Sequence, residues 1–425
     1  MVKLKEHKRE TENKAIEKIP LPSKAYIPLS QHIGKICEPL VKINDLVAVG
    51  QKIASAQAQV TAPVHASLSG KISSIADWPH PVLGRCKAIA IEGDGLDTRY
   101  SILDTRQPEE IDKLTAEEIR GIVQEAGIVG MGGASFPTHI KLNPPKPVNT
   151  LIINGAECEP YLNSDNRLMI EKTVQVIAGI SLIVKCIGAK SIFIAIEDNK
   201  PEAIKAFKAV CDKRYAISIL KSQYPQGGEK QLIKAILKRE VPSGKLPFDI
   251  GVVVQNVATV NAIYEAVYLK QPLYERVVTV TGDCLENPGN FLVRIGTPIK
   301  NLIAKCGPLK KEPRKILFGG PMMGIAQYSL DTPVIKSTNG IIVLSESRVS
   351  EAQEAICIRC GRCVEYCPVG LTPCLINLAS RKEKWDLASA YGCLDCMECG
   401  LCNYVCPQKI NIVQAIKQAK TRLPK

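Results

Sequence analysis

The chain has 425 residues, of which 45% are hydrophobic, 23% are charged and only 5% are aromatic. This composition excludes a disordered protein, and the length exceeds one ordinary hydrophobic core, so we expect roughly two to four domains. The formal net charge of +13 is spread along the chain and does not cluster with aromatic side chains. That distribution disfavours nucleic-acid binding and suits phosphate-bearing cofactors, an acidic redox partner or an anionic membrane face.

Neither a signal peptide nor a membrane span is predicted. Residues 1–20 are charged and polar, without the apolar region of a signal peptide. The longest apolar stretch, Val174–Val184, is about 11 residues long and contains Gln175 and Ser181. That length is typical of a buried helix. We therefore expect a soluble or peripheral protein.

The N-terminal part of the chain, residues 1–110, is predicted to be a leader followed by a β module. Residues 1–24 are expected to form a mobile leader ending at Pro20 and Pro22. Glycines then separate short β-prone pieces, which predicts a small all-β fold. The expected strands are Ala25–Leu29, Leu46–Val49, Gly70–Ile75 and Ala88–Ile91.

The text "VKINDLVAVGQKIA" followed by "TAPVHASLSGKISSI" resembles the barrel-sandwich folds of biotinyl and lipoyl carriers. Those carriers need a modifiable lysine at a hairpin tip. No lysine occurs between Lys52 and Lys71. We therefore expect this module to be structural and not a carrier.

A helix is predicted directly after residue 115. Thr115 and Glu118 form a capping box, and Ile119 and Val123 fall on one apolar face together with Ile122 and Ala126. Gly127 stands where a helix-ending glycine belongs.

Residues 111–270 then alternate between strand and helix patterns. Near-continuous apolar strands between helices predict a Rossmann-like parallel α/β sheet covered on both faces. The expected strands are Thr150–Asn154, Ser191–Ile196, Ile217–Lys221 and Ile250–Val254. The expected helices are Arg167–Ile187, Pro201–Lys213, Glu229–Lys238 and Val257–Leu269.

Two smaller parts complete the predicted multidomain α/β protein. Residues 271–345 return to a β pattern, with "RVVTVTG", a turn at Asn287–Gly289 and "NFLVRIG". Residues 346–425 are rich in cysteine and are expected to be helical.

The 17 cysteines divide unevenly, with seven scattered between Cys37 and Cys306 and ten crowded into Cys357–Cys406. Metal ligation in a reducing compartment explains the crowding better than a disulfide scaffold does. The first run is Cys357-x2-Cys360-x2-Cys363-x3-Cys367-Pro368. The second is Cys396-x2-Cys399-x2-Cys402-x3-Cys406-Pro407.

Each run matches the bacterial ferredoxin spacing, in which three thiolates hold one [4Fe–4S] cluster and the fourth reaches the other cluster. We therefore predict two crossed ligand sets. One is Cys357, Cys360, Cys363 and Cys406, and the other is Cys396, Cys399, Cys402 and Cys367. Zinc is the competing interpretation, but a triple plus a distant Cys-Pro, occurring twice, exceeds what a zinc site needs. Cys374 and Cys393 lie outside the pattern and are expected to be ordinary buried thiols, with Cys393 as an alternative ligand.

The text "GIVGMGGASFPTHIKL", from Gly127 to Leu142, is a glycine loop. A helix precedes it, and Pro137, Pro144 and Pro145 are expected to bar a helix immediately after it, so it is neither the dinucleotide-binding fingerprint nor a Walker loop. Four glycines in seven residues, followed by Lys141, could still approach a phosphate closely, and a merely mobile loop is the alternative.

This loop resembles the flavin loop of the NADH-binding flavoprotein subunit of respiratory complex I, as do "NGAECEP", "QGGEKQL" and "QNVAT". The chain resembles still more closely the C subunit of the Rnf (Rsx) electron-transport complex. The texts "IPLSQHIG", "INGAECEPYL", "VVTVTGD" and "GGPMMG" extend that likeness over nearly the full length. The family implies a β-grasp-like (SLBB-type) module at 271–345 and a ferredoxin-like pair of [4Fe–4S] clusters at 346–425.

The resemblance also implies ligand-binding residues. FMN would be contacted by Gly130, Gly132, Gly133, Lys141, Asn154, Gly228, Glu229, Asn256 and Thr259. The nicotinamide nucleotide would be flanked by Phe136, Glu159, Lys245 and Phe248, with Glu157 lining the same pocket. For Asn256 and Thr259, helix N-terminal capping is the alternative.

Two positions depart from the complex I pattern. Ala156 replaces an acid, and Lys230 replaces the second glutamate of a Glu-Glu pair. Details of complex I at these positions therefore should not be transferred to this chain.

By resemblance, we expect the NAD(H)-handling subunit of an ion-pumping ferredoxin:NAD⁺ oxidoreductase. It would be peripheral on the cytoplasmic face of the cell membrane, and its partners would be the membrane and iron–sulfur subunits, with ferredoxin reached indirectly. It would relay electrons between NAD(H), FMN and two [4Fe–4S] clusters. The alternatives are a soluble reductase for a corrinoid or another acceptor, and a cluster-bearing scaffold without flavin.

Overall fold

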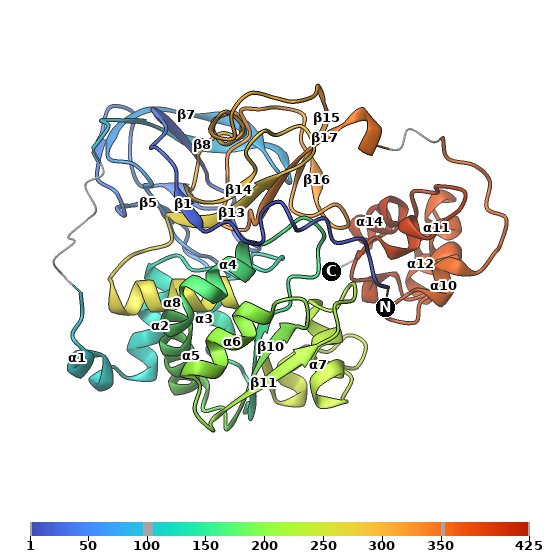
Figure 1. Cartoon of the computed structure of the whole chain (residues 1–425), viewed down its shortest axis with the longest axis horizontal. Helices are drawn as coiled ribbons and strands as arrows, with labels where there is room; N and C mark the ends of the chain where they lie inside the picture. The colour runs from blue at the N-terminus through green and yellow to red at the C-terminus, as the bar shows by residue number, and fades with distance from the viewer. Residues whose placement is uncertain (1, 97–104, 350–352, 424–425) are drawn as a thin grey trace.

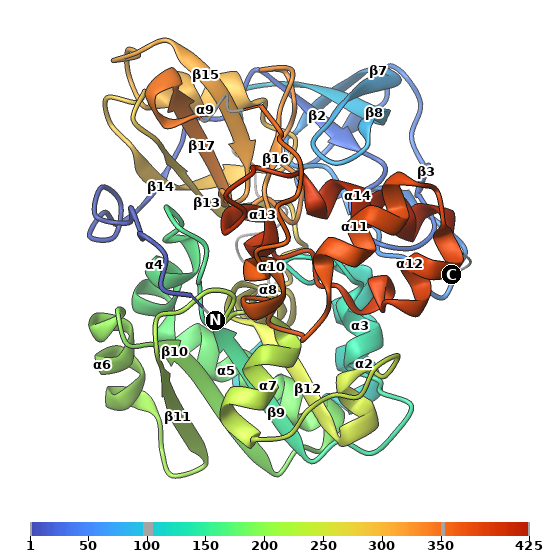
Figure 2. The same cartoon turned by 90° about the vertical axis from the view of Figure 1, so that its right-hand side faces the viewer.

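The computed structural model describes residues 2–96, 105–349 and 353–423. Two β modules lie side by side above an α/β domain, and a small helical domain lies at one end of the molecule (Figure 1). Seen from that end, the helical domain covers the joint between the α/β domain and the β modules (Figure 2). The joint therefore brings segments from all parts of the chain together.

The N-terminal β module consists of two small sheets that face each other across a hydrophobic core. The predicted strands are confirmed, and the module has three further short strands. Gly70 has φ +147°, and a Cβ atom there would lie 2.0 Å from the Glu92 carbonyl oxygen, so only glycine fits. One sheet has β2 (Lys24–Pro28), β8 (Gly84–Gly93), β7 (Gly70–His80) and β4 (Leu46–Val47), and the other has β3 (Glu38–Pro39), β5 (Lys52–Ser55) and β6 (Val64–His65).

The prediction of a mobile leader at residues 1–24 is wrong for the described residues. Strand β1 (Ile16–Lys18) pairs in parallel with β14 (Gly289–Arg294) of the other β module. Lys8 and Thr11 are buried. The segment is polar because its backbone and side chains bond to polar loops far along the chain, and a sequence pattern does not reveal such partners.

The α/β domain contains the predicted parallel sheet, in the order β11 (Tyr215–Leu220), β10 (Ser191–Glu197), β9 (Thr150–Gly155), β12 (Val252–Asn256). Alternate residues of β9 point to opposite faces. Leu151 and Ile153 join one hydrophobic cluster, and Ile152 joins another. The first face is covered by α2 (Ala116–Glu125), α5 (Thr173–Ile187), α6 (Pro201–Val210) and α8 (Val257–Tyr268), and the second by α7 (Glu229–Leu237).

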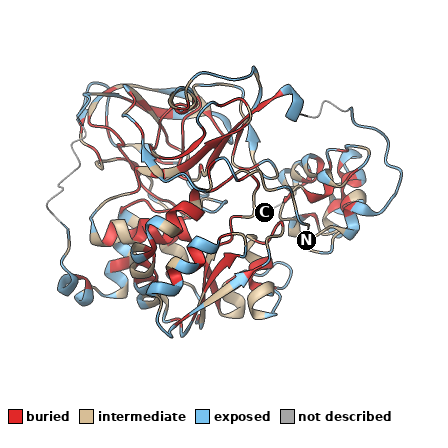
Figure 3. Cartoon of the chain, viewed as in Figure 1, coloured by how far each residue is buried: buried red, intermediate tan, exposed pale blue. Residues whose placement is uncertain are grey.

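In Figure 3 the buried residues of α5 and α8, in red, lie beside paler residues that are more exposed. The capping box of α2 is present, because the Thr115 side chain accepts a hydrogen bond from the Glu118 amide. Gly127 follows the helix with φ +66°, as predicted.

Two helix predictions need correction. The helix expected at 167–187 is two helices, α4 (Ser164–Glu171) and α5, separated at Lys172, whose φ of −123° is not helical. A one-turn helix, α3 (Thr138–Lys141), begins directly after Pro137, because proline is tolerated at a helix start. The remaining short helices of the domain are α1 (Pro108–Lys113) and η1 (Pro247–Ile250).

The second β module is a mixed sheet with the order β1-β14-β13-β17-β15-β16. It uses β1 from the N-terminal segment as its edge strand, so the first and third parts of the chain share one sheet. The predicted strands on each side of Asn287–Gly289 are confirmed. The other elements are β13 (Glu275–Thr281), α9 (Ile299–Lys305), β15 (Pro313–Phe318), β16 (Ile325–Ala326), β17 (Gly340–Ser345) and η2 (Glu346–Arg348).

The C-terminal domain is helical, as predicted, and packs around its own small core. Within the described parts of the chain, every helix is too short or too polar to cross a membrane. The elements of this domain are α10 (Arg362–Glu365), α11 (Pro373–Arg381), α12 (Trp385–Ala390), η3 (Cys393–Asp395), α13 (Leu401–Tyr404) and α14 (Ile412–Arg422).

Candidate functional site

A cavity of about 340 Å³ lies at the carboxyl ends of β9 and β12. This edge of a parallel sheet is where ligands bind in open α/β folds. The glycine loop, the loop after β9 and the loop between β11 and α7 enclose the cavity. The predicted site residues that line it are Gly130, Gly132, Gly133, Phe136, Lys141, Asn154, Glu157, Glu159, Gly228, Glu229 and Asn256.

Three predicted site residues do not line this cavity. Lys245 is exposed beside η1. Phe248 packs against the hydrophobic core of the α/β domain. Thr259 is fully buried beneath the glycine loop, where its hydroxyl oxygen accepts a hydrogen bond from the Met131 amide at 2.9 Å. The structure therefore places Thr259 as a support of the loop.

The glycine loop lies against the start of α8 because it lacks side chains at the contact. A Cβ atom on Gly132 would lie 3.1 Å from the Cβ of Asn256, which is tighter than usual contacts. The Gly130 amide donates to the Phe136 carbonyl at 2.8 Å, which folds the loop back on itself. Gly130, Gly132 and Gly133 line the cavity without a side chain, so they leave room for a phosphate to approach the backbone.

Asn256 caps α8, and the capping interpretation of this residue is confirmed. Its Oδ1 accepts hydrogen bonds from the amides of Ala258 at 2.8 Å and Thr259 at 3.4 Å. Its Nδ2 donates to Asp165 Oδ2 at 2.7 Å. The N-terminus of this 12-residue helix faces the cavity and favours a negatively charged group there.

Lys141 carries a positive charge into the cavity, but it is not free. Its ammonium group donates to Glu229 Oε1 at 2.7 Å and to the Val254 carbonyl at 2.9 Å. A bound anion would compete with Glu229 for this ammonium group.

The loop after β9, residues 156–163, is here called the acidic loop. Glu157 caps the start of α4, because its carboxylate accepts from the Ser164 hydroxyl at 3.0 Å and the Asp165 amide at 3.1 Å. Glu159 accepts from the amides of Met322 at 3.1 Å and Met323 at 2.8 Å in the second β module. Burial raises the pKa of Glu159 to about 7, although these two amides oppose the shift.

Asp165 is a cavity residue that sequence reasoning missed. Burial, followed by the nearby charge of Glu157, raises the pKa of Asp165 to about 7. The predicted helix begins at Arg167, so the prediction assigns Asp165 to no element. The polar Asn163–Ser164–Asp165 sequence is the available signal of an earlier helix start.

The loop between β11 and α7, the second β module and the C-terminal domain complete the cavity wall. Gly227, Met323 and Met397 lie within sequence motifs but are not predicted as site residues. The cavity is also lined by Tyr224, Pro225, Gly227, Met323, Asn339 and Met397.

The second cysteine run forms one neighbourhood with Cys367 of the first. Burial, followed by the charges of Cys396 and Cys399 and then of Cys367, raises the pKa of the Cys402 thiol to about 12. Backbone amides also point at these sulfurs, since Leu371 donates to Cys367 Sγ at 3.3 Å and Glu398 donates to Cys396 Sγ at 3.4 Å. Four neighbouring thiols, two of which accept hydrogen bonds from backbone amides, are a donor set that fits an iron–sulfur cluster.

The other predicted ligand set is less enclosed. Cys363 and Cys406 are buried in the domain core, whereas Cys357 and Cys360 are exposed. Burial, followed by the neighbouring Cys374 thiol, raises the pKa of Cys363 to about 11. Across the described residues, no group of three or more His, Cys, Asp or Glu is arranged to hold a single metal ion.

Of the two thiols outside the pattern, Cys393 is buried, as predicted. Cys374 is only half-buried. It lies beside Cys363, so its surroundings include a predicted cluster ligand.

The second cysteine run also borders the cavity. The Tyr224 hydroxyl, from a residue that lines the cavity, donates to the Cys399 carbonyl at 2.7 Å. Met397 lines the cavity directly, and Ser243 of the α/β domain donates to Asp395 Oδ2 at 2.5 Å. Among the described residues that line the cavity, none belongs to the first cysteine run.

Family models match most parts of this chain. The Nuo51 FMN-binding domain matches residues 123–265, and the RnfC barrel sandwich hybrid domain matches residues 2–96. The SLBB domain matches residues 277–326, and the 4Fe-4S binding domain matches residues 353–371.

Three similar relatives cover nearly the whole chain. The C subunit of the proton-translocating ferredoxin:NAD(+) oxidoreductase complex of Clostridium ljungdahlii is 47% identical, over 97% of this chain and 91% of the relative. The C subunit of the Na(+)-translocating ferredoxin:NAD(+) oxidoreductase complex of Acetobacterium woodii is 45% identical, over 95% of this chain and 91% of the relative. The C subunit of the ion-translocating oxidoreductase complex of Rhodobacter capsulatus is 43% identical, over 98% of this chain and 81% of the relative.

Among solved structures, an NAD⁺-reducing [NiFe]-hydrogenase in the air-oxidized state is similar, with a TM-score of 0.51 and 20% identity. The match covers 68% of this chain and 57% of the hydrogenase chain. At this identity the likeness concerns the fold alone.

Proposed function

The chain belongs to the RnfC family, the C subunits of ion-translocating ferredoxin:NAD(+) oxidoreductase complexes, and from this premise we propose that it relays electrons between NAD(H), FMN and two [4Fe–4S] clusters. It is an oxidoreductase subunit with an FMN-binding domain and a ferredoxin-type domain. Its partners are other subunits of such a complex. We further propose that these are the membrane and iron–sulfur subunits, reached at the cytoplasmic face of the membrane.

The proposal rests above all on one observation, the direct contact between the cavity wall and the second cysteine run. Met397 lines the cavity, and Tyr224 connects the cavity wall to Cys399 through a hydrogen bond of 2.7 Å. Electron transfer slows steeply with distance, so a redox group in the cavity and a cluster on these thiols are suitably placed to exchange electrons.

The cavity residues suit a flavin phosphate and a nicotinamide. A bound flavin supplies the conversion between the two electrons of a nicotinamide hydride and the single electrons that clusters accept. We propose that the glycine-loop amides, the start of α8 and Lys141 bind the phosphate-bearing group, with Asn154, Gly228 and Glu229 completing the flavin site. Phe136 and Glu159 then remain for the nicotinamide nucleotide.

We also propose an order for the two clusters. The ligand set Cys396, Cys399, Cys402 and Cys367 would hold the cluster nearer to the cavity. The set Cys357, Cys360, Cys363 and Cys406 would hold the outer cluster. This order is supported by the lining of the cavity, where the described residues from the C-terminal domain come from the second run alone.

Quantifying cofactors after anaerobic purification tests the function. We expect one FMN and about eight iron and eight sulfide per chain. Addition of NADH should bleach the flavin absorbance and reduce the clusters, as seen by electron paramagnetic resonance. Stoichiometric zinc with little iron, or a protein that lacks flavin and does not oxidise NADH, would contradict the proposed relay.

A further inference from the structure

The N-terminal residues 2–11, here called the N-terminal clamp, lie where three parts of the molecule meet. In Figures 1 and 2 this dark-blue segment runs from the second β module, past the start of α4, to the C-terminal domain. It contacts the acidic loop, the loop between β11 and α7, and the second cysteine run, as the following contacts show.

Lys8 is the centre of the clamp. Its side chain is buried, and its ammonium group donates to the backbone carbonyls of Glu157 and Leu162 at the two ends of the acidic loop. Burial lowers the pKa of Lys8, as does the nearby charge of Lys200, whereas Glu157 opposes the shift. Burying an ammonium group without hydrogen-bond acceptors is costly. Lys8 therefore favours the conformation of the acidic loop in which both carbonyl groups accept its hydrogen bonds.

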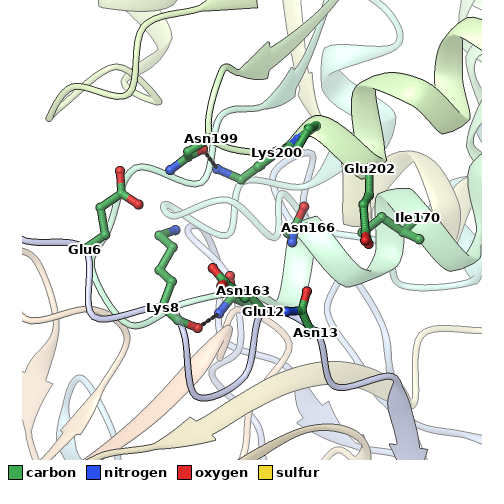
Figure 4. A pocket seen from close by; sticks show the side chains of 11 residues that line it. Glu6, Lys8, Glu12, Asn13, Asn163, Asn166, Ile170, Asn199, Lys200 and Glu202 are labelled. Atoms are coloured by element: carbon green, nitrogen blue, oxygen red, sulfur yellow. Dashed lines mark hydrogen bonds between the residues drawn. The ribbon is translucent and has the colours of Figure 1, made fainter.

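The backbone of the clamp binds the same loop. Asn163 Nδ2 donates to the Lys8 carbonyl at 2.8 Å and to Thr11 Oγ1 at 2.7 Å. The Tyr161 amide donates to the Glu6 carbonyl at 2.8 Å. Figure 4 shows Lys8 and Asn163 with their hydrogen bond, facing a polar pocket behind the loop.

The other side of the acidic loop faces the cavity. Glu157 and Glu159 both line the cavity, while the carbonyl and amide groups of the loop are bonded to the clamp. The position of these two carboxylates therefore depends on contacts made from behind the loop.

The first residues of the clamp lie where the α/β domain contacts the C-terminal domain. The amides of Val2 and Tyr224 each donate to the other residue's carbonyl, at 2.9 and 2.8 Å. Val2 and Leu4 pack against the buried cluster of Tyr224, Cys399 and Leu401. The same segment thus contacts the cavity wall and a cysteine of the second run.

We propose that the N-terminal clamp positions two parts of the relay at once: Lys8 fixes the acidic loop in the cavity, and Val2 and Leu4 fix the second cysteine run against the cavity wall. This inference rests on the proposed function. A purely structural segment would make the same contacts, but its loss would weaken every activity together. The clamp instead predicts that Lys8 and Leu4 affect different steps.

The test uses the full-length holoprotein and three variants of the clamp. Lys8→Met removes the ammonium group, Leu4→Asp places a charge in the joint, and Lys5→Met is the matched control at an exposed position of the same segment. For each protein, bound FMN, the thermal unfolding midpoint, the kinetics of NADH-dependent ferricyanide reduction and the rate of cluster reduction in rapidly frozen samples would be measured.

We expect Lys8→Met to raise KM for NADH about tenfold with a much smaller change in kcat, since loss of a charged hydrogen bond costs about one decade in affinity. Leu4→Asp should leave ferricyanide reduction unchanged and slow cluster reduction at least about tenfold, and Lys5→Met should match the wild type. If Leu4→Asp does not accumulate, Leu4→Ala carries the same test with a smaller effect in the same direction.

Two results would overturn the clamp. One is cluster reduction at the wild-type rate in the Leu4 variant, with unchanged KM in Lys8→Met. The other is a proportional loss of all activities in both variants, together with a lowered unfolding midpoint, because that shows a purely structural segment. Failure of the proposed function would be visible earlier, as a wild-type protein that binds no FMN or does not oxidise NADH.

Discussion

The first cysteine run leaves Cys357 and Cys360 exposed, whereas the second run buries Cys399 beside Tyr224 of the α/β domain and Cys402 in the core of the C-terminal domain. Their spacing is identical, so the sequence pattern predicts the same chemistry for both. The surroundings differ because only the second run borders Tyr224 and the described cavity lining. Spacing therefore predicts what each run binds, whereas the proposed order of the two clusters depends on the packing around the runs.

Removing two ligands of the second run should produce the largest effect. In the Cys399→Ser, Cys402→Ser variant, iron should fall from about eight to about four per chain. NADH-dependent ferricyanide reduction should persist, and electron transfer to the partner subunits in reconstituted membranes should be lost. The control is Cys86→Ser in the N-terminal β module, which should keep all iron. Loss of both activities with FMN still bound would show that the electron order is wrong.

The crossing of ligands can be tested by one substitution in each neighbourhood. Because Cys367 lies beside Cys396, Cys399 and Cys402, Cys367→Ser should first perturb the cluster nearer to the cavity. Cys363→Ser should perturb the outer cluster. Electron paramagnetic resonance of the two reduced variants would distinguish the clusters, and identical spectral changes would contradict the crossing.

The joint beside the second run contains a titratable group, Glu159, whose pKa burial raises to about 7 from its ordinary value of 4.5. The folded protein thus binds this proton more tightly than the unfolded chain does. The resulting stability is complete below pH 4.5 and is lost as the pH rises through 7, by on the order of 3 kcal/mol. Denaturant unfolding of wild type and Glu159→Gln should therefore diverge between these pH values, and parallel pH profiles would contradict the raised pKa.

On the other side of the cavity, Lys141→Ala should weaken FMN binding by one to two decades, since a charged hydrogen bond contributes roughly 1.5–3 kcal/mol. The Lys234→Ala variant is the matched control, because Lys234 is an exposed lysine of α7 that does not line the cavity, and its loss should not weaken FMN binding. Equilibrium dialysis of FMN measures both. Unchanged retention in Lys141→Ala would show that Lys141 does not contact the flavin.

Local features of this fold can be predicted from the sequence because their partners are close along the chain. The capping box of Thr115 and Glu118 spans three residues, and the cysteine runs carry their ligand spacing within a dozen residues. The composition of the glycine loop identifies it, and the structure places most of its predicted partners on one cavity.

Features held by distant partners could not be predicted. Lys8 is bonded to a loop 149 residues away, so the local pattern of its segment predicts only a mobile leader. Thr259 is expected at the ligand but supports the glycine loop, because its partner Met131 lies 128 residues earlier. Asp165 escapes the prediction because α4 begins at Ser164, ahead of the expected start at Arg167.

The smallest predicted effect concerns the hydrogen bond that joins the second cysteine run to Tyr224 of the α/β domain, a contact that the first run lacks among the described residues. Tyr224→Phe removes the hydroxyl that donates to the Cys399 carbonyl and leaves that buried carbonyl without this donor. The expected loss is about 1 kcal/mol of unfolding free energy, with a modest slowing of cluster reduction.

Tyr404→Phe is the matched control, because Tyr404 is 55% exposed on α13 of the same domain. Denaturant titration and rapid-freeze spectroscopy would measure both quantities. Since the substitution is almost isosteric, a slowed reduction in Tyr224→Phe but not in Tyr404→Phe would place the electron route at this joint. Equal behaviour of the two variants would direct the search to Met397 and the rest of the cavity wall.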